Sequence, residues 1–294
     1  MTLEQLRIFV AVAEREHLTQ GARALNLTQS AVSSAVATLE ARYATRLFDR
    51  IGRRIVLTEA GRLFLVEARA VLARAAAAET VLSDLSGLAR GSLALTASQT
   101  VANYWLPPLI QRFRQDHPGI TVSLAIANTE TVSAAIRDGE ADLGFIEGEV
   151  DDPALAMTAV AEDELVIVVP AGHGWARARP PASELRRGAW VLREPGSGTR
   201  AMFEAALPGL GLASGDLAIA LELPSNEAIC AAVAAGAGAT AISRLVAANA
   251  IAAGRLATVD LPLPKRRFLA LRHKERYLAK AAAAFLALAS NGGR

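Results

Sequence analysis

The N-terminal part of the chain has apolar residues at the three- and four-residue spacing of amphipathic helices. The first such helix carries Leu3, Leu6, Phe9, Val10 and Ala13. Thr19 is a candidate N-cap for a short second helix over Gly21–Leu25, which a tight break follows. Thr28 is the candidate N-cap of a third helix that runs to Tyr43. Its core-facing side would carry Ala31, Val32, Ala35, Val36 and Leu39. Two helices joined by a short turn are typical of a helix-turn-helix.

The next segment, Leu47–Thr58, has arginines on both sides of Gly52, which indicates the tip of a short hairpin or wing. A long helix is predicted from Thr58, another candidate N-cap, to about Ser86. One stripe of it carries Leu63, Val66, Ala70, Ala73, Ala77, Val81 and Leu85. Because no neighbouring segment offers a surface for this stripe, we expect a linker helix that pairs with its copy in a second chain.

Beyond Gly91 the pattern changes to short apolar strands that alternate with helices. The predicted strands are Ser92–Ala97, Thr121–Ala127, Ala141–Phe145, Glu164–Pro170, Trp190–Arg193, Leu217–Leu223, Ala239–Ser243 and Phe268–His273. The predicted helices are Val101–His117, Glu130–Asp138, one after Gly198, Asn226–Ala235 and Tyr277–Leu288. This alternation predicts parallel sheets covered by helices.

Composition narrows the class of protein. The chain has 294 residues, of which 52% are hydrophobic and 20% charged, enough for two or three domains with well-filled cores. A net charge of +2 does not by itself indicate a nucleic-acid partner, so DNA binding has to depend on local charges. Neither a basic leader nor an apolar run long enough for a bilayer is present in the sequence. We therefore expect a cytoplasmic protein with no membrane partner.

The sequence offers no constellation for catalysis. The histidines, His17, His117, His173 and His273, are scattered without metal-ligand spacing. Ser197 lacks the spacing of a nucleophile elbow. The single cysteine, Cys230, lies among apolar residues, so we expect an inert thiol and neither a disulfide nor a cysteine zinc site. No enzyme activity, metal or cofactor is predicted.

Leu3–Gly61 closely resembles the DNA-binding part of the LysR-type transcriptional regulators, and the resemblance extends over essentially the whole chain. It is carried by Leu6-Arg7-Ile8-Phe9, by Ala22–Ser33, by Leu47-Phe48-Asp49-Arg50 and by Leu57-Thr58-Glu59-Ala60-Gly61. Within that family, Ser98-Gln99-Thr100, Asn103–Pro107 and Leu192–Arg200 resemble regulators of sulfur assimilation and carbon-dioxide fixation.

The resemblance implies an α + α/β protein. Its parts would be a winged helix-turn-helix (1–58), a linker and dimerisation helix (59–88) and an effector domain like a periplasmic solute-binding protein (89–294). In that domain, subdomain I would comprise 89–161 and 267–294, and subdomain II 162–266. The family implies a homodimer or a dimer of dimers, and RNA polymerase is a further candidate partner. A transport solute-binding protein would share the second half, but the N-terminal helix-turn-helix argues against one.

The predicted DNA contacts lie at the front of the third helix and on the wing. They are Thr28, Gln29, Ser30, Ser33, Ser34, Arg50, Arg53 and Arg54. Hydroxyls and helix N-termini bind phosphate, glutamine can read adenine, and arginines on a wing suit phosphate or the minor groove of an operator. The helix itself carries little charge, so the arginines would supply most electrostatic affinity. The alternative is that these side chains only solvate a helix face and a turn.

The predicted effector site lies where strands end and helices begin, because the N–H groups and positive dipole ends of helices meet there. Its candidates are Ser98, Gln99, Thr100, Asn128, Thr129, Glu147, Ser197, Gly198, Thr199, Arg200 and Asn226. Four such helix starts, with a full charge from Arg200, predict a small anionic effector. Glu147 would either pair with Arg200 or accept hydrogen bonds from the ligand. The alternative is a simple turn with an N-cap, and a surface salt bridge for Arg200.

Overall fold

In the computed structural model, residues 1–51, 54–85, 91–148 and 150–291 are described. They form an N-terminal unit over Met1–Leu85 and a larger C-terminal unit over most of the remainder. In these ranges no helix is both long and apolar enough to cross a bilayer, and no three His, Cys, Asp or Glu side chains gather as a metal site would need.

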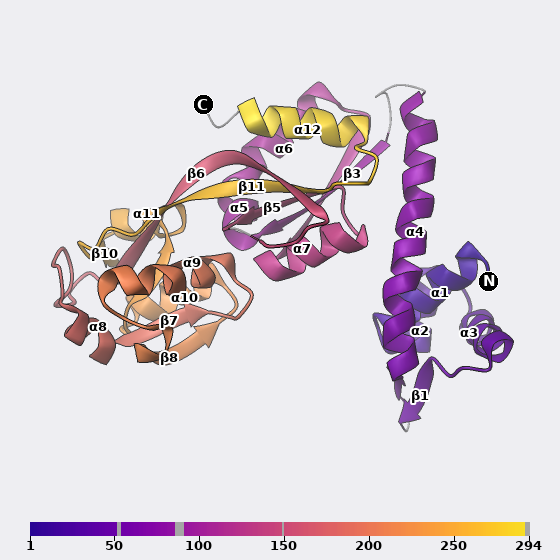
Figure 1. The fold of residues 1–294 in the computed structure, drawn as a ribbon, viewed down its shortest axis with the longest axis horizontal. Helices are drawn as coiled ribbons and strands as arrows, with labels where there is room; N and C mark the ends of the chain where they lie inside the picture. Colours follow the sequence, from indigo (N-terminus) through magenta and orange to yellow (C-terminus); the bar gives the residue numbers. More distant parts are fainter. Residues whose placement is uncertain (52–53, 86–90, 149, 292–294) are drawn as a thin grey trace. The chain divides into compact units, whose positions relative to one another are not determined.

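The N-terminal unit has the predicted winged helix-turn-helix and long helix (Figure 1). Its elements are α1 (Leu3–Ala13), α2 (Leu18–Ala24), α3 (Gln29–Tyr43), β1 (Phe48–Ile51), β2 (Arg54–Leu57) and α4 (Glu59–Leu85). Thr28 caps α3 and Thr58 caps α4, since their hydroxyls accept hydrogen bonds from Ala31 N and Gly61 N at 3.2 and 2.9 Å. β1 and β2 pair as an antiparallel hairpin, whose predicted tip, Gly52, lies outside the described residues.

Two details of this unit differ from the prediction. Thr19 is not an N-cap, because α2 already begins at Leu18; its hydroxyl instead donates to Gln29 Oε1 at 3.1 Å, which joins α2 to α3. The long helix α4 does have a local partner. Phe64 packs on Phe9 of α1 with ring centroids 4.8 Å apart, and the next turn buries Ala68 in the same core. The pattern missed this because the face that packs on α1 is not the stripe of Leu63.

The described part of the C-terminal unit forms seventeen helices and strands with two short 3-10 turns. They are β3 (Gly91–Ser98), α5 (Gln99–Tyr104), α6 (Leu106–Asp116), β4 (Ile120–Ala127), α7 (Thr129–Asp138), β5 (Leu143–Glu147), β6 (Leu155–Pro170), α8 (Ala182–Arg187), β7 (Ala189–Arg193), α9 (Gly198–Ala206), η1 (Leu207–Leu210), η2 (Ser214–Asp216), β8 (Ala218–Leu223), α10 (Asn226–Ala234), β9 (Thr240–Ser243), α11 (Arg244–Ala252), β10 (Leu256–Thr258), β11 (Lys265–His273) and α12 (Lys280–Asn291). The helix predicted over 101–117 is broken at Trp105, because the prolines that follow start α6 anew.

The sheets are mixed rather than parallel throughout. The large sheet has the order β10-β6-β11-β5-β3-β4, and β9 also pairs with β6. β3 is parallel to β4 and β5, and β7 is parallel to β8, as predicted. β6 and β11 are antiparallel to each other and to their other neighbours, which the local alternation did not reveal. The first half of β6, α8, α11 and β10 were also missed.

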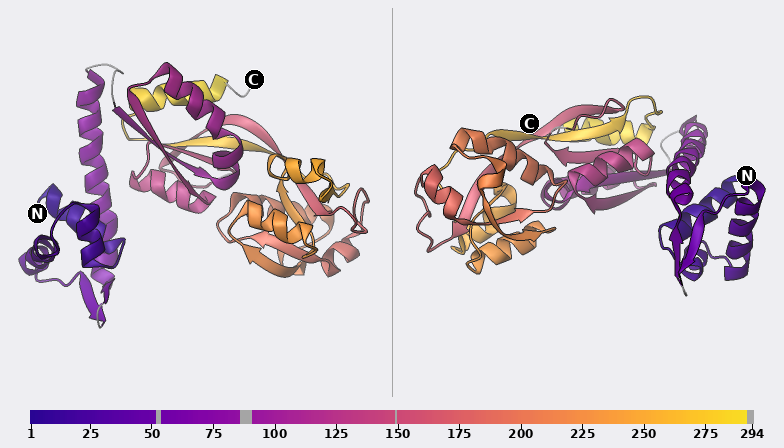
Figure 2. Two further views of the ribbon diagram at one scale, coloured as in Figure 1. Left: turned by 180° about the vertical axis from the view of Figure 1, so that it is seen from behind. Right: turned by 60° about the horizontal axis from the view of Figure 1, so that its bottom comes forward.

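β6 and β11 lie side by side and run from one subdomain into the other (Figures 1 and 2). The predicted subdomain boundaries at 161 and 266 fall inside these two strands, so the chain crosses twice, each time within a strand. α6 and α12 cover one face of subdomain I and α7 the other (Figure 2). Separate buried clusters, one around Phe145 and Phe285 and one around Trp190 and Phe203, fill the two subdomains.

Candidate functional site

The predicted DNA contacts of the N-terminal unit are exposed side chains of α3 and the hairpin. Thr28, Gln29, Ser30 and Ser34 are exposed and Ser33 is half-buried. Arg50 on β1 and Arg54 on β2 are exposed, whereas Arg53 lies outside the described residues. Ala31, expected in the core, is exposed as well, while Val32 and Val36 are buried as predicted. The start of α3 therefore presents polar and small side chains to solvent.

In the C-terminal unit, five buried polar side chains meet at the junction of the two subdomains. They are Ser98, Thr100 and Glu147 from subdomain I and Thr199 and Arg266 from subdomain II, here called the Glu147 cluster. Ser98 Oγ donates to the Glu147 carboxylate, as do Thr199 Oγ1 at 3.0 Å and Thr100 Oγ1 at 3.5 Å. A carboxylate that is 1% exposed needs such donors. Hydroxyls from both subdomains thus converge on one acid.

Arg266 is the basic residue of this cluster and was not among the predicted site residues. Its Nε donates to Asp163 Oδ2 at 2.6 Å, and its Nη1 donates to Thr199 Oγ1 at 3.0 Å and lies 3.9 Å from Glu147 Oε1. Two carboxylates therefore share one guanidinium. A signal was available: Arg266 stands two residues before the buried Phe268, on a strand where residues two apart share a face.

Gln99 and Asn226 join α5 to the start of α10 on one side of this cluster. Gln99 Nε2 donates to Pro224 O at 2.8 Å, and Gln99 Oε1 accepts from Asn226 N at 2.9 Å. Asn226 Nδ2 donates to Thr100 Oγ1 at 3.2 Å, and Asn226 Oδ1 accepts from Arg193 Nη1 at 2.7 Å. Both predicted residues therefore serve contacts between the subdomains.

Asn103 and Tyr104 extend this α5–α10 contact. Asn103 Nδ2 and Tyr104 Oη both donate to Glu227 Oε1, at 3.3 and 3.2 Å. Burial, together with the charge of Glu227, raises the pKa of Tyr104 to about 12, so the phenol remains a donor at neutral pH. The same two causes raise the pKa of the Cys230 thiol to about 11, which agrees with the predicted inert cysteine.

Arg200 does not reach the Glu147 cluster. Its Nε donates to Glu204 Oε1 at 2.8 Å, and its Nη1 donates to Glu222 Oε2 at 2.6 Å and to Arg193 O at 2.9 Å. Arg200 therefore ties α9 to β8 within subdomain II. Of the two alternatives for Glu147, the pairing with Arg200 is wrong in this structure, because Arg266 is the guanidinium next to Glu147.

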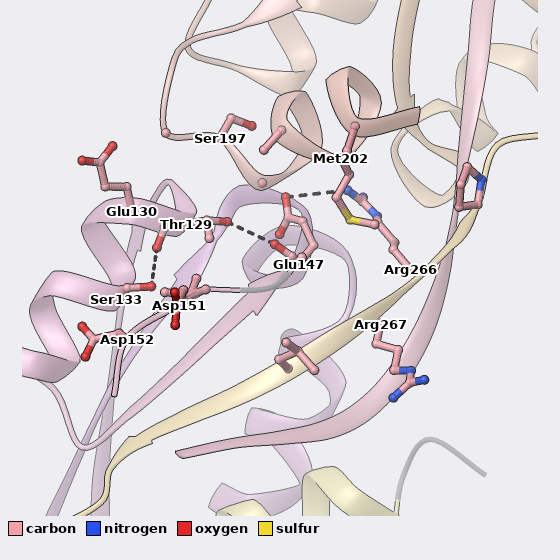
Figure 3. Close-up of a pocket in the computed structure, with 18 of the residues that line it drawn as sticks. Thr129, Glu130, Ser133, Glu147, Asp151, Asp152, Ser197, Met202, Arg266 and Arg267 are labelled. Carbon is pink, nitrogen blue, oxygen red and sulfur yellow. Dashed lines mark hydrogen bonds and ion pairs between the residues drawn. The ribbon is translucent and has the colours of Figure 1, made fainter. Parts of the chain in front are cut away.

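A pocket of about 900 Å³ opens between α7 and α9, with β11 along its side (Figure 3). We call it the α7–α9 pocket. Four predicted site residues line it, namely Thr129, Glu147, Ser197 and Gly198. Ser98, Thr100, Thr199 and Asn226 are buried, outside its lining. Arg266 and Arg267 both line the pocket, and their side chains point to opposite sides of β11 (Figure 3).

The helix starts around the site differ in how they are capped. Asn128 Oδ1 accepts from Thr131 N at 3.0 Å and caps α7, and Ser225 Oγ accepts from Ala228 N at 3.3 Å and caps α10. Ser197, at the start of α9, makes no such bond. Its hydroxyl oxygen is buried and has no hydrogen-bond partner among the described residues. The first turn of α9 therefore leaves N–H donors without a side-chain cap, beside the pocket.

Comparisons with known protein families match both units. Residues 3–62 match the family described as bacterial regulatory helix-turn-helix protein, lysR family, and residues 86–293 match the LysR substrate binding domain. Over 292 residues the chain is 36% identical to the HTH-type transcriptional regulator YeiE of Escherichia coli K12, with 97% of this chain and 96% of that protein covered. It is also 36% identical over 290 residues to a probable RuBisCO transcriptional regulator of Cyanophora paradoxa, covering 97% and 90%.

Solved structures show the same fold. The LysR family regulator CbnR aligns over all of both chains with a TM-score of 0.72 and 21% identity. The regulatory domain of CcmR from Synechocystis PCC6803, solved in complex with 2-PG, covers 70% of this chain and 98% of that domain, with a TM-score of 0.64 and 27% identity.

Proposed function

Because the chain belongs to the LysR-type transcriptional regulators, we propose that it binds its operator as a homodimer or dimer of dimers and that a small anionic effector alters how it bends DNA. As a member of this family it is a DNA-binding regulator with an effector-binding domain, and not an enzyme. Its relatives include regulators related to carbon-dioxide fixation. The link to sulfur assimilation stays a prediction.

The start of α9 carries the proposal of an anion. It combines free N–H donors, the positive end of the helix dipole and the buried, unpartnered hydroxyl of Ser197, all beside the α7–α9 pocket. An anion bound there would satisfy these donors, since buried polar groups without partners are costly. The 2-PG complex of the CcmR regulatory domain supports a ligand in this type of domain.

The charges of the Glu147 cluster determine where the anion would lie. Within the cluster Arg266 contributes one positive charge and Glu147 one negative charge, and the adjacent Asp163 adds a second negative charge, so an anion placed directly on Glu147 is repelled. The proposed position is therefore the α9 side, with Ser197 and Gly198 as donors and Arg266 as the nearest buried cation. The other predicted residues, Ser98, Gln99, Thr100, Asn128, Thr129, Thr199 and Asn226, would act by holding the subdomains in register, and Arg200 by fixing α9.

The anion site is tested by titrating the full-length protein with sulfate, sulfite, inorganic phosphate and acetate while its thermal unfolding is followed. We expect at least one of them to raise the Tm, and Ser197→Ala to weaken its binding about tenfold, as loss of one charge-assisted hydrogen bond does. Ser290→Ala, an exposed serine of α12 outside the pocket, is the matched control. Failure of every anion to stabilise the protein would overturn the proposal.

Glu147 carries a charge of the same sign as the proposed ligand. It therefore offers a second test, in which a substitution should tighten anion binding instead of weakening it. Glu147→Gln retains an acceptor for the surrounding hydroxyls but removes a negative charge that lines the pocket. Anion binding should become about tenfold tighter, the size of an interaction of roughly 1–2 kcal/mol. Unchanged or weaker binding in a variant that unfolds at the wild-type temperature would place the anion elsewhere.

The DNA contacts are proposed for the exposed side chains of α3 and the hairpin. Gln29 and Ser30 would meet base edges, Thr28, Ser33 and Ser34 the backbone, and Arg50, Arg53 and Arg54 phosphates or the minor groove. Arg54→Ala should weaken binding to all sequences and flatten its salt dependence, whereas Gln29→Ala should cost about 1–3 kcal/mol on the operator only. Arg187→Ala, an exposed arginine of the C-terminal unit, is the control. Footprints that both variants leave unchanged would contradict the assignment.

The proposed assembly depends on the stripe of α4. Leu63, Val66 and Val81 are exposed in the single chain, although Phe64 and Ala68 are packed on α1. A second α4 is the partner that such a stripe fits. Sedimentation of the full chain should give a dimer or tetramer, and Leu63→Glu with Val66→Glu should shift it toward monomer. Bending is measured on circularly permuted operator fragments with and without effector, because only an effector that favours one state can change the bend.

A further inference from the structure

The α7–α9 pocket is larger than a small inorganic anion requires, and its α9 wall is apolar beyond the start of that helix. Its volume of about 900 Å³ lies in the range that holds drug-sized ligands. Beyond Ser197 and Gly198, the exposed side of α9 carries Ala201, Met202 and Ala205. On the opposite wall, α7 contributes Glu130 and Ser133 (Figure 3), together with Ala134 and Arg137. Along α9, the donors therefore lie at the start of the helix, and small apolar side chains follow for about two helical turns.

Along α9, the polar contacts come first and the apolar contacts follow. Ser197 precedes the helix, Gly198 is its first residue, and Met202 and Ala205 follow at positions that share one face of a helix. Val150 and Leu269 add further apolar side chains to the pocket lining. A ligand whose head is held at the start of α9 would thus direct its remainder along Met202 toward Ala205.

We infer that the effector is an amphipathic anion: a carboxylate or phosphate head on an apolar body of several carbons, rather than an inorganic oxyanion. The anionic head of this ligand rests on the proposed function, and the apolar body is what the inference adds. Alanines at 201, 205 and 206 leave the space that the body fills, and Met202 supplies a flexible apolar contact. Charged residues line other parts of the pocket: Arg137 and Asp152 are paired with each other at 3.2 Å, and Glu130, Asp151, Lys265 and Arg267 also belong to the lining.

The test uses straight-chain carboxylates of increasing length, with acetate, butyrate, hexanoate and octanoate titrated into the full-length protein. Each methylene that enters the apolar part should tighten binding by about two- to fourfold. Octanoate should therefore bind far more tightly than acetate. Hexanamide, which has the same body without the charge, should bind at least tenfold more weakly than hexanoate.

One variant separates the body from the head. Ala205→Trp fills the pocket two turns away from Ser197 and should abolish the gain with chain length while acetate binds as before. Ala248→Trp, at an exposed alanine of α11 outside the pocket, is the matched control and should change neither.

The outcomes distinguish the two proposals. If acetate or phosphate binds and longer chains gain nothing, the amphipathic effector is wrong and the anion site stands. A length gain that survives Ala205→Trp also overturns the inference, because the body then lies elsewhere. If hexanamide binds as well as hexanoate, the anionic head of the proposed function is wrong. If none of these compounds and no inorganic anion binds, both proposals fall.

Discussion

The two sides of the junction between subdomains I and II are built in opposite ways. On the α5–α10 side, Gln99, Asn103 and Tyr104 hydrogen-bond directly to the segment Pro224–Glu227 of the other subdomain. On the α7–α9 side, the helices face each other across the pocket, and the bonds that cross are those near their starts, such as Glu130 N to Gly196 O at 3.2 Å. Polar side chains close one side, whereas on the other side the small apolar side chains of α9 leave a pocket open.

This difference indicates how a ligand could act on the protein. A rotation that preserves the α5–α10 contacts would mainly change the distance between α7 and α9, where few bonds have to break. The strands that would absorb such a rotation are β6 and β11, which run from one subdomain into the other. We therefore expect effector binding to change the distance between α7 and α9. The α5–α10 contact, which we call the fixed edge, would stay in place.

Removing Arg266, the guanidinium that Asp163 and Glu147 share, should have the largest effect on stability. Arg266 lies on β11, one of the two strands that connect the subdomains, so both sides of the junction depend on it. Arg266→Met would leave Asp163 and Glu147 as two buried carboxylates without a guanidinium, which costs about 3–5 kcal/mol of stability. Thermal and urea unfolding of the C-terminal unit should both reveal the loss. Lys265→Met changes the exposed neighbour on the same strand and should leave stability within about 0.5 kcal/mol of wild type. Equal stabilities of the two variants would refute the role of Arg266.

The second-largest effect is expected from a substitution that pushes the two subdomains apart. A Cβ on Gly198 would overlap the carbonyl oxygen of Glu147, which belongs to the other subdomain. Gly198→Ala should therefore cost about 1–3 kcal/mol, as overpacking does, and weaken anion binding because α9 moves away. Gly209→Ala, where a Cβ meets open space, is the matched control for thermal unfolding and anion titration. If Gly198→Ala behaves like the control, the subdomains are not in close contact there.

Loosening the fixed edge should have a smaller effect. Gln99→Ala removes two hydrogen bonds between the subdomains, each worth about 0.5–1.5 kcal/mol. We expect a modest loss of stability together with faster hydrogen exchange in α10, whereas exchange in α9 should stay the same. If hydrogen exchange increases in α9 but not in α10, Gln99 does not hold the α5–α10 side of the junction.

The smallest expected effect concerns the thiol beside that edge. Since burial and the charge of Glu227 raise the pKa of Cys230 to about 11, only a small fraction is thiolate at pH 8 and a thiol reagent should react slowly. Glu227→Gln removes the second cause and should speed the reaction about threefold. Glu275→Gln, an exposed acid far along the chain, should not. The sole cysteine makes this rate a direct measure of the α5–α10 side.

Features that depend on neighbouring residues could be predicted from the sequence, and those that depend on distant ones could not. Thr28 and Thr58 were identified as caps because a cap is defined within three residues of its partner. The antiparallel pairing of β6 with β11 joins residues about a hundred positions apart, so the local alternation of strands and helices predicted parallel sheets instead.

The candidate site follows the same division. The polar residues at the helix starts were predicted, because hydroxyls and amides there have a local signature. The partners of Arg200 were not, since Glu222 comes from β8, and the role of Arg266 requires Asp163 and Glu147 from two other strands. Nor does the sequence distinguish Asn128, which caps its helix, from Ser197, which does not.

Because β6 and β11 each cross from one subdomain to the other, the two subdomains can fold only in a certain order while the chain is being synthesised. Subdomain II is one continuous stretch that ends at β11, whereas subdomain I needs β11 and α12 to complete its sheet and to bury Phe285 against Phe145. During translation, residues 91–148 therefore leave the ribosome long before their last strand and helix, and subdomain II can close first. We expect nascent chains truncated before Lys265 to contain a protease-resistant subdomain II beside a first subdomain that awaits its final pieces.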